Sequence, residues 1–487
     1  MELLAKVIGW INGMVWSPPM IVLCTGAGLY FSVRMGFPQI RYLKDMIKLS
    51  ISGQGSSSGI SPFQAFATTV GARVGIGNIA GVAAAVHFGG PGAIFWMWLI
   101  TFAGAGSSFV ETVLGQAYKT RRFDGEYVGG PAFYIEKGLK LKSLAWLFVI
   151  ATFVGPGIFM PGVQMHSITA SVREAFNLNE YVTAVVICAV IALVICGGIK
   201  RIGKTAEFMI PFMCLVYILI TGAVCVLRIE DVPKVFILIF SSAFGMEEMY
   251  SGIMGATIAW GIKRGVYSNE AGMGSGALLA APAECKHPTT QGLVQILSVY
   301  ADTLIICTAS ALIILTSGSF NVVKPDGSNI VANIPDVHFG ILYVQHGLNT
   351  VLTGTWAGKV LSISVALFAF TTIMGYYYQA ESNISYLFKN KPYMIWVFRV
   401  VFLGTNFLGV LIEGGILWDM ADIGVGSMAW INIIAILFLS RQAFIILRDY
   451  EKQIKEGKEL TFDPMIINVV DDTKVWPGAT TPADKAN

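Results

Sequence analysis

The chain has 487 residues, of which 55% are hydrophobic and 13% charged, and its mean hydropathy is +0.66. These values lie outside the range of soluble globular proteins. They predict a polytopic membrane protein with the lipid bilayer as its surroundings and without a nucleic-acid partner. The formal net charge of +3 says little by itself.

Nearly uncharged stretches that reach the ~20 residues needed to cross a bilayer recur along the whole chain. We expect eleven of them: 16–32, 61–88, 91–117, 143–169, 180–198, 206–227, 250–282, 292–316, 352–378, 393–412 and 415–440. We expect no soluble domain between them. The start, MELLAKVIGWINGMVWSPPM, lacks a basic segment followed by an uninterrupted apolar core, so we expect no cleaved signal peptide. The seven cysteines are odd in number and lie mostly inside the spans, which favours packing over a disulfide framework.

Basic residues collect after the first, third and fifth spans. They are Arg34, Arg41, Lys44 and Lys48, then Lys119, Arg121, Arg122, Lys137, Lys140 and Lys142, then Lys200, Arg201 and Lys204. Because positive loops stay in the cytoplasm, we expect a multi-pass cell-membrane protein with its N-terminus outside and its C-terminus inside. The tail from Glu451 carries three prolines without an apolar period and is predicted to be mobile cytoplasmic chain.

Two of the predicted spans contain anomalies that favour broken helices. VGARVGIGNIAGVAAAV, residues 70–86, has glycines four apart, which could serve helix packing alone. Its run Gly75, Ile76, Gly77 and Asn78, however, combines poor helix formers with a polar amide and indicates unwinding. Five spans later, SNEAGMGSGALLAAP, residues 268–282, repeats the pattern of glycines, an asparagine and small hydroxyls. Unwound backbone at membrane depth needs a ligand, an ion or protein to satisfy it.

The two anomalies divide the chain into two sets of five spans, each opening with a broken helix. An odd number of crossings per set inserts the second set upside down relative to the first. Such inverted repeats are typical of secondary transporters, with the site where the breaks meet near the midplane. There, half-helix N-termini suit a carboxylate and free carbonyls suit a cation. We expect an extra N-terminal helix and basic segment at 1–59, repeats at 60–228 and 229–446, and a tail at 447–487.

At these residues the chain resembles the alanine or glycine:cation symporter family, whose members are sodium-coupled amino acid carriers with a LeuT-type fold. SPFQAFATTVGARVGIGNIAGVAAAV and GVYSNEAGMGSGALLAAPAECKHPTTQG resemble its two signature segments, and ALFAFTTIMGYYYQAE its segment in the ninth span. The likeness runs from about residue 10 to 445. It implies an all-α polytopic fold, a LeuT-type 5+5 inverted repeat with one extra N-terminal helix, and import of a small neutral amino acid, alanine or glycine, with Na+.

The resemblance also implies a ligand set. The substrate residues are Gly75, Ile76, Gly77, Asn78, Gln164, Ser268, Asn269, Gly272, Gly274 and Tyr376, with Gln164 at the amino group. The sodium ligands are the carbonyls of Gly71, Val74 and Phe368 and the hydroxyls of Thr371 and Thr372. Hard oxygen donors suit sodium, and threonines one turn beyond Phe368 can supply them. Their alternative role is hydrogen bonding to their own helix.

Departures from the family pattern concern the pocket. Where this chain has Ile76 and Tyr376, family members commonly have Thr and Trp. Residues 161–166 stand where family members have a more Asn-rich run. The pocket of this chain is therefore expected to differ in size and polarity from the pockets of those family members. The alternative function is a proton-coupled or uncoupled carrier of a larger neutral amino acid such as glutamine. Few carboxylates are expected near the centre, which disfavours proton coupling.

Ionisable residues within the spans are functional hypotheses. Arg73 is either a built-in positive charge that replaces a second sodium or the partner of Glu270 or Glu111. Glu111 is expected to reach interfacial water or to pair with Arg121. Lys263 and Arg264, just before the second break, indicate an aqueous vestibule or a carboxylate nearby.

Other function classes find less support in the sequence. A membrane enzyme would need a nucleophile with its base, and neither GxSxG nor HExxH occurs. The five histidines show no metal-ligand spacing, so no such metal site is expected. A channel would repeat a filter sequence, which this chain does not do. The polar stretch 317–340 is expected to be an external loop that covers the outer vestibule.

Overall fold

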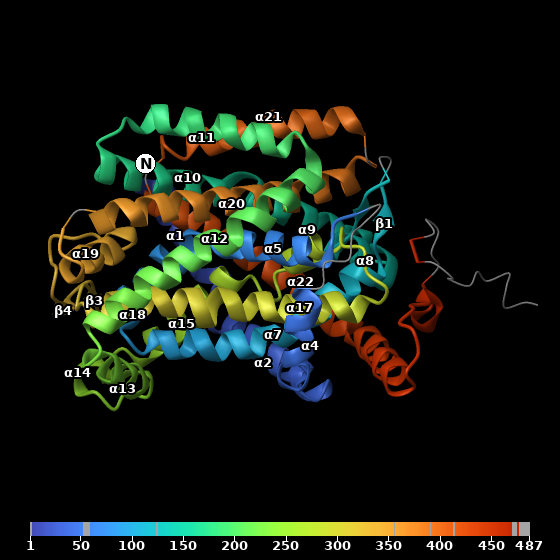
Figure 1. Ribbon diagram of the computed structural model, residues 1–487, viewed down its shortest axis with the longest axis horizontal. Coiled ribbons are helices and arrows are strands. Elements are labelled where there is room, and N and C mark those ends of the chain that lie inside the picture. The colour runs from blue at the N-terminus through green and yellow to red at the C-terminus, as the bar shows by residue number, and fades with distance from the viewer. Residues whose placement is uncertain are drawn as a thin grey trace, which may run out of the picture.

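The structure is a computed structural model that describes residues 2–51, 59–122, 125–354, 356–389, 391–412, 414–469 and 475–476. Most of its helices run along one long axis and form an elongated bundle (Figure 1). The helices of the first half are α1 (Glu2–Val15), α2 (Pro18–Arg34), α3 (Pro38–Arg41), α4 (Leu43–Ile51), α5 (Pro62–Arg73), α6 (Ala80–Gly89), α7 (Ala93–Ala117), α8 (Pro131–Leu139), α9 (Lys142–Val154), α10 (Met160–Phe176), α11 (Glu180–Ile195) and α12 (Gly198–Leu227).

The second half adds α13 (Asp231–Ala243), α14 (Glu248–Ser251), α15 (Met254–Asn269), α16 (Ser275–Ala280), α17 (Pro288–Tyr300), α18 (Thr308–Thr316), α19 (Ile341–Val351), α20 (Trp356–Leu387), α21 (Pro392–Leu408) and α22 (Gly414–Lys455). Short 3-10 turns are η1 (Ile76–Asn78) and η4 (Pro464–Ile467), and π-helical turns are η2 (Gly155–Phe159) and η3 (Ala301–Cys307). Two small antiparallel hairpins pair β1 (Thr120–Arg121) with β2 (Tyr127–Val128) and β3 (Asn321–Val323) with β4 (Asn329–Ala332).

Seven helical stretches among the described residues are long and apolar enough to cross a membrane. They are Ala5–Arg34, Ala93–Ala117, Lys142–Phe176, Gly198–Leu227, Pro288–Thr316, Trp356–Leu387 and Gly414–Lys455. A bent pair, α5 with η1 and α6, passes the same test with a bend of 59°. The shorter apolar helices α11 and α21 and the pair α15 and α16 correspond to the three remaining predicted stretches. The predicted all-α membrane fold is confirmed, and the count of eleven spans stays a prediction.

Both predicted helix breaks are present, and the backbone gives their local cause. The first break lies between α5 and α6, residues 74–79, and the second between α15 and α16, residues 270–274. α5 starts with a capping box between Ser61 and Gln64 and stops at Arg73, because Val74 leaves the helical region at ψ 90° and Gly75 is extended at φ −138°. α15 stops at Asn269, after which Glu270 takes φ +53°. Gly272 and Gly274 follow at φ +84° and +87°, a region that glycine enters without a steric penalty.

Exposure divides the bundle into an inner and an outer set of helices. Every side chain of η1 and α16, and every one of α6 up to Val86, is buried. By contrast, α12 and α21 carry large exposed apolar side chains, such as Phe208 at 80% and Val400 at 71%. A bilayer stabilises such a surface, since lipid tails are as apolar as these side chains. The broken helices therefore lie at the centre of the bundle, shielded by the rest.

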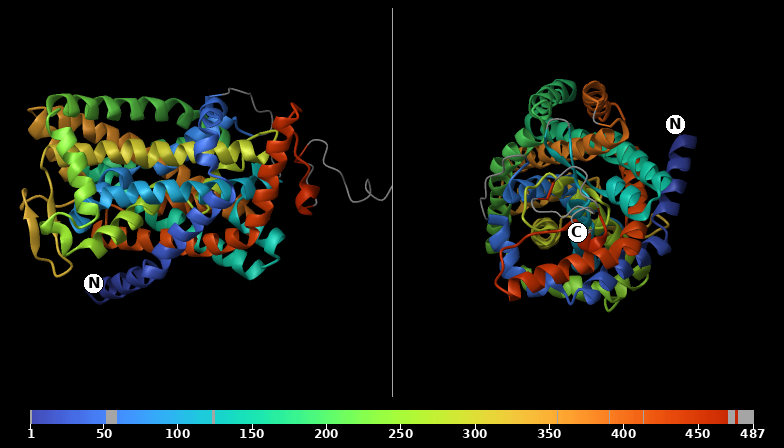
Figure 2. Two further views of the ribbon diagram at one scale, coloured as in Figure 1. Left: turned by 90° about the horizontal axis from the view of Figure 1, so that it is seen from below. Right: turned by 90° about the vertical axis from the view of Figure 1, so that its right-hand side faces the viewer.

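The two ends of the bundle differ. The β3–β4 hairpin with α13, α14 and α19 lies at one end, and α4, α8, β1 and the end of α22 lie at the other (Figure 1). The N-terminus is at the hairpin end (Figure 2). At the opposite end, Ile60 exchanges main-chain hydrogen bonds with Pro282 and Glu284, which ties the start of α5 to the segment after α16.

α2 matches the first predicted span, 16–32, and α1 precedes it and packs against α22. The stretch 317–340 contains the β3–β4 hairpin, and its place outside the membrane stays a prediction. The expectation for the tail was wrong. The tail is not mobile over its described part: α22 continues to Lys455, and Phe462 and Trp476 are buried against each other at 4.9 Å between ring centroids. Residues 470–474 and 477–487 of the predicted tail lie outside the described residues.

Candidate functional site

The predicted sodium residues meet where α5 ends against the middle of α20. The Thr372 hydroxyl oxygen lies 2.9 Å from the Gly71 carbonyl oxygen, 3.2 Å from that of Val74 and 3.0 Å from that of Phe368. Gly71 and Val74 are at the C-terminal end of a helix, where carbonyls lack an intrahelical partner. We call Thr372 and these three carbonyls the oxygen cluster. All four residues are buried.

The oxygen cluster has more acceptors than donors. A hydroxyl carries one hydrogen, so Thr372 satisfies one of the three carbonyls that converge on it. A cation would interact favourably with all four oxygens at once, and the hard oxygen donors suit sodium. Thr371 is not in the cluster: its hydroxyl donates to the Phe368 carbonyl at 2.9 Å and faces the Met213 sulfur at 3.7 Å. Both threonines also form the hydrogen bond to their own helix that was their alternative role, since each hydroxyl contacts the Phe368 carbonyl.

The unwound segment after α5 is held by two amide side chains. The Gly75 N–H donates to the Asn78 side-chain oxygen at 2.9 Å, and the Ile76 N–H donates to the Gln164 oxygen at 3.1 Å. A Cβ added at Gly75 would lie 2.4 Å from the Thr372 hydroxyl and 3.1 Å from the Gln164 oxygen. Gly75 therefore lies directly between the oxygen cluster and Gln164, and only glycine fits there.

The first break also touches the second break. A Cβ at Gly77 would lie 3.2 Å from the Tyr267 ring and 3.7 Å from Ser268 Cα. Asp302, in η3, joins the two: its carboxylate accepts from Asn78 Nδ2 at 2.6 Å and from the Ser268 hydroxyl at 2.8 Å. Asp302 was not among the predicted site residues. Its signal was a single acidic residue within an apolar span, which by itself is a functional hypothesis.

Three predicted substrate residues of the second break face away from the first one. The Asn269 side chain donates to the Thr101 hydroxyl of α7 at 3.2 Å. The Gly272 carbonyl accepts from Asn432 of α22 at 2.8 Å, and the Gly274 N–H donates to Glu111 of α7 at 2.9 Å. Of the residues predicted at the second break, the structure therefore brings Ser268 to the first. Tyr376, one turn after Thr372 on α20, is buried in the same region.

Arg73 is buried behind the first break between α7 and α17. Its guanidinium donates to the Ser298 hydroxyl, to the Gln295 carbonyl at 3.3 Å and to the Ser108 hydroxyl at 3.2 Å. Within the described part of the chain, no carboxylate lies within 4.0 Å of it. A direct ion pair with Glu270 or Glu111, one of the two alternatives for Arg73, is therefore not formed.

The expectation for Glu111 was wrong. Instead of reaching water or Arg121, its carboxylate is fully buried and accepts from the Gly274 N–H and from Asn432 Nδ2 at 2.8 Å. With Glu270 and Asp302, it makes three buried carboxyl groups around the second break. The central carboxylates are not scarce, so the argument against proton coupling fails.

Comparison with known proteins now decides the family. The profile of the sodium:alanine symporter family matches residues 1–464. The chain belongs to this family.

Two relatives from bacteria cover most of the chain or all of it. The "Sodium/proton-dependent alanine carrier protein" of Bacillus sp. (strain PS3) is 41% identical over 86% of this chain and 94% of its own. The "Probable sodium/glutamine symporter GlnT" of Bacillus subtilis (strain 168) is 39% identical over 100% and 99%. Among solved structures, MhsT in complex with L-phenylalanine superposes with a TM-score of 0.49 at 14% identity, covering 80% of this chain and 100% of that chain.

In this symporter, a second polar cluster lies before the second break, toward the hairpin end. Asp422 of α22 accepts two hydrogen bonds from the Arg264 guanidinium, at 2.9 and 3.1 Å, and lies 2.6 Å from Lys263 Nζ. This carboxylate is the partner expected for the two cations. Lys263 also contacts Asn12 of α1 at 3.2 Å and borders a cavity of about 310 Å³ that Asn12 and Trp260 help to line.

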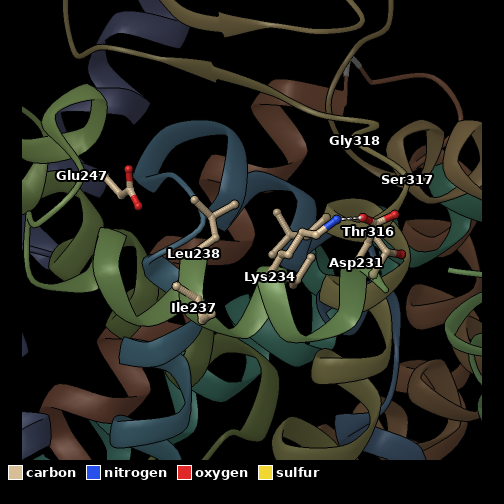
Figure 3. Close-up of a pocket in the computed structure, with 10 residues that line it drawn as sticks. Asp231, Lys234, Ile237, Leu238, Glu247, Thr316, Ser317 and Gly318 are labelled. Carbon is tan, nitrogen blue, oxygen red and sulfur yellow. Dashed lines mark hydrogen bonds and ion pairs between the residues drawn. The ribbon is translucent and has the colours of Figure 1, made fainter. Parts of the chain in front are cut away.

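One cavity that the structure describes is not part of the symporter's site. It has about 580 Å³ and lies between α13 and the end of α18, lined by residues such as Leu238 and Thr316 (Figure 3). None of the predicted site residues lines it. Beside it Lys234 donates to Asp231 at 2.9 Å, and this bond lowers the pKa of the Asp231 carboxyl and raises the pKa of Lys234. The cavity is a surface groove at one end of the bundle.

Proposed function

We propose that this symporter imports a small neutral amino acid, alanine or glycine, together with Na+ across the plasma membrane by alternating access. The observation that carries the proposal is the oxygen cluster, where the carbonyls of Gly71, Val74 and Phe368 converge on the Thr372 hydroxyl at the broken helix. Family membership supports the same transport class. Transport, not catalysis, is then the function of the central site.

In this proposal Na+ binds the carbonyls of Gly71, Val74 and Phe368 and the hydroxyl of Thr372. The ion links the end of α5 to the middle of α20, two helices that belong to different repeats. Binding therefore stabilises the arrangement in which these helices are in contact, and substrate binding to that arrangement is favoured in turn. Thr371 completes the predicted set as a candidate ligand that would have to rotate its hydroxyl away from its own helix.

The substrate carboxylate would bind next to the unwound segment Gly75 to Asn78. The N–H groups at the start of a half-helix carry partial positive charge and suit an anion. Gln164 is the candidate partner of the amino group, and Tyr376 and Ser268 border the same region. To bind the substrate, the amide side chains that now occupy the Gly75 and Ile76 N–H groups would have to yield them.

Glutamine is the second candidate cargo. One relative is named as an alanine carrier and another as a glutamine symporter, at nearly equal identity. Ile76, where the family commonly has threonine, changes the pocket wall. A competitor series that ranks glycine, alanine, serine, leucine and glutamine, each as both stereoisomers where they exist, separates these cargos.

The proposed orientation has the N-terminus and the β3–β4 hairpin outside and the C-terminus in the cytoplasm. The support is the positive-inside rule. The basic residues after the first and third spans lie in α3, α4, β1 and α8 and next to them, at the end opposite the hairpin. A protease or a thiol reagent applied to intact cells, with single cysteines in the hairpin or near Lys140, tests this orientation.

The experiment that tests the proposed function is uptake of radiolabelled alanine into proteoliposomes with an inward gradient of Na+, K+ or H+. Accumulation that requires the sodium gradient is the expected result. Equilibration without dependence on any gradient would contradict symport and indicate a facilitator. Absence of uptake for every amino acid in the competitor series would contradict the substrate class.

A further inference from the structure

The second break is surrounded by more buried negative groups than positive ones. Arg73, Glu111, Glu270 and Asp302 are each at most 2% exposed, and they interact electrostatically with one another. Three carboxyl groups thus face one guanidinium. Burying an ionised carboxylate is costly unless hydrogen bonds or a cation compensate its charge. A buried carboxylate without such compensation binds a proton and becomes neutral.

The three carboxyl groups differ in how well they are compensated. Asp302 accepts from three donors, Asn78 Nδ2, the Ser268 hydroxyl and the Thr303 hydroxyl. Glu111 accepts from a main-chain N–H and an amide, both at Oε2, and its Oε1 has no hydrogen-bond partner among the described residues. Its amide partner Asn432, unlike Gln379, has its own oxygen satisfied by the Tyr134 hydroxyl. Glu270 accepts one hydrogen bond, from a neutral donor, so it has the fewest hydrogen bonds of the three, although Arg73 and the Ser275 side chain also interact with it.

That single donor is Gln379 of α20, whose Nε2 lies 3.2 Å from Glu270 Oε2. The other oxygen of each side chain, Oε1 of Glu270 and Oε1 of Gln379, is buried and has no hydrogen-bond partner among the described residues. The Ser275 hydroxyl contacts the main-chain carbonyl of Glu270 at 3.4 Å. Both side chains are fully buried, so two hydrogen-bond acceptors of one amide–acid pair are left over.

A proton satisfies both leftover oxygens. An ionised carboxylate only accepts, but a carboxylic acid has an O–H that can donate to the Gln379 Oε1, while Gln379 Nε2 continues to donate to Glu270. The pair then forms two antiparallel hydrogen bonds, and the buried charge disappears. A sodium ion would need several further oxygens, whereas this pair offers two.

We propose that Glu270 is a proton-binding site of the symporter, which is protonated while paired with Gln379 and releases that proton to water on the cytoplasmic side during transport. The proton comes from water on the outer side, binds Glu270 Oε1 and leaves from the same oxygen, so that one proton crosses per cycle. This inference rests on the proposed function and adds a second coupling ion to it.

The pairing allows proton binding at Glu270 to affect the sodium site through α20. Gln379 follows Thr372 by seven residues on α20, which is about two turns or ~10 Å along the same face of the helix. α20 therefore contacts the first break through Thr372 and the second break through Gln379. Loss of the proton removes one hydrogen bond and leaves a buried charge, and both effects favour separation of α20 from the second break.

The charged and titratable groups that face Glu270 from the elements around it define what else can titrate. They are Arg73 of α5, Asp302 of η3, Glu111 of α7, Tyr267 of α15 and Tyr376 of α20. An E270Q variant separates Glu270 from these groups, because its amide keeps the size of the side chain and removes the ionisable group.

The test uses the full-length protein in proteoliposomes with a pH-sensitive dye in the lumen. With alanine and a sodium gradient, the wild type is expected to acidify the lumen in proportion to alanine uptake. E270Q is expected to lose this proton movement, and whatever uptake remains in it is expected to be independent of pH. The control is E381Q. Glu381 is a buried carboxylate on α20, two residues after Gln379, and it forms an ion pair with Arg122. In E381Q, Arg122 still has its second ion-pair partner, Glu126, at 3.2 Å. This variant is expected to keep the wild-type ratio of protons to alanine.

A spectroscopic measurement covers the case in which E270Q folds but transports nothing. Infrared difference spectra of the purified protein between acidic and alkaline buffer are expected to show a carboxylic-acid C=O band that E270Q lacks and E381Q retains. Sodium-driven alanine uptake by the wild type without any proton movement would overturn the inference and leave the proposed function intact. Proton movement that persists in E270Q would overturn it too. A wild type without any uptake would contradict the proposed function, and the infrared band would still decide the protonation of Glu270.

Discussion

Gly75 offers the sharpest test of the oxygen cluster. A Cβ at this residue would lie 2.4 Å from the Thr372 hydroxyl and 3.1 Å from the Gln164 oxygen, and both side chains are buried, so neither can move into water. Overpacking of a buried site costs about 1–3 kcal/mol. If this strain acts on the hydroxyl that completes the sodium site, G75A weakens sodium binding by about 5- to 150-fold.

The matched control is G81A, six residues further along the same bent span. A Cβ at Gly81 would come no closer than 3.8 Å to any neighbouring atom, the nearest being Arg264 Cδ, which is ordinary van der Waals contact. G81A is therefore expected to keep sodium affinity and, because alanine is the better helix former, to lose no stability. The assay is the sodium concentration for half-maximal alanine uptake, together with the melting temperature in NaCl and in KCl. Wild-type sodium dependence in G75A would refute the reasoning, as would equal damage in both variants.

Three further perturbations follow from the contacts. T372V, which keeps the shape of the side chain but loses the hydroxyl, is expected to abolish the stabilisation that NaCl gives over KCl, whereas T372S retains it; equal behaviour of the two variants would exclude the hydroxyl as a ligand. D422N leaves two buried cations without a carboxylate and is expected to cost about 3–5 kcal/mol in thermal unfolding, while D231N on exposed α13 leaves the melting temperature unchanged. W476A removes the ring that packs on Phe462 and lies 4.8 Å from Lys119 Nζ, so the tail is expected to be cut by protease far sooner than in the wild type while the core stays intact; equal cleavage rates would contradict the docked tail.

The breaks could be predicted because their cause is local. Glycine and asparagine within an apolar run have low helix propensity wherever they occur, so Gly75 to Asn78 marks the end of α5 without reference to the rest of the fold. The residues of the oxygen cluster were expected from the resemblance to the family rather than from a local pattern, and their role as sodium ligands stays a prediction. The choice between Thr371 and Thr372 depends on the rotation of α20, which no local pattern of an almost uniformly buried helix reveals.

The second break shows what local reasoning leaves out. Its glycines were expected to face the substrate, but positive φ at Gly272 and Gly274 turns them toward α7 and α22 instead. Asp302 escaped notice because a lone acid in an apolar span has no sequence pattern around it, and its partners come from residues 34 and 224 positions away. Such long-range pairs are visible only when the fold brings them together.

One helix, α20, connects the two breaks, and this gives coupling a physical form. It contributes Thr372 to the end of α5 and Gln379 to the end of α15, and both contacts are buried hydrogen bonds. Sodium at the first contact and a proton at the second would each stabilise the same position of α20. A ligand shifts such an equilibrium only by its difference in affinity for the two arrangements. Two ions that bind at separate points on one rigid helix add their effects, and the substrate between them is then held most tightly when both are bound.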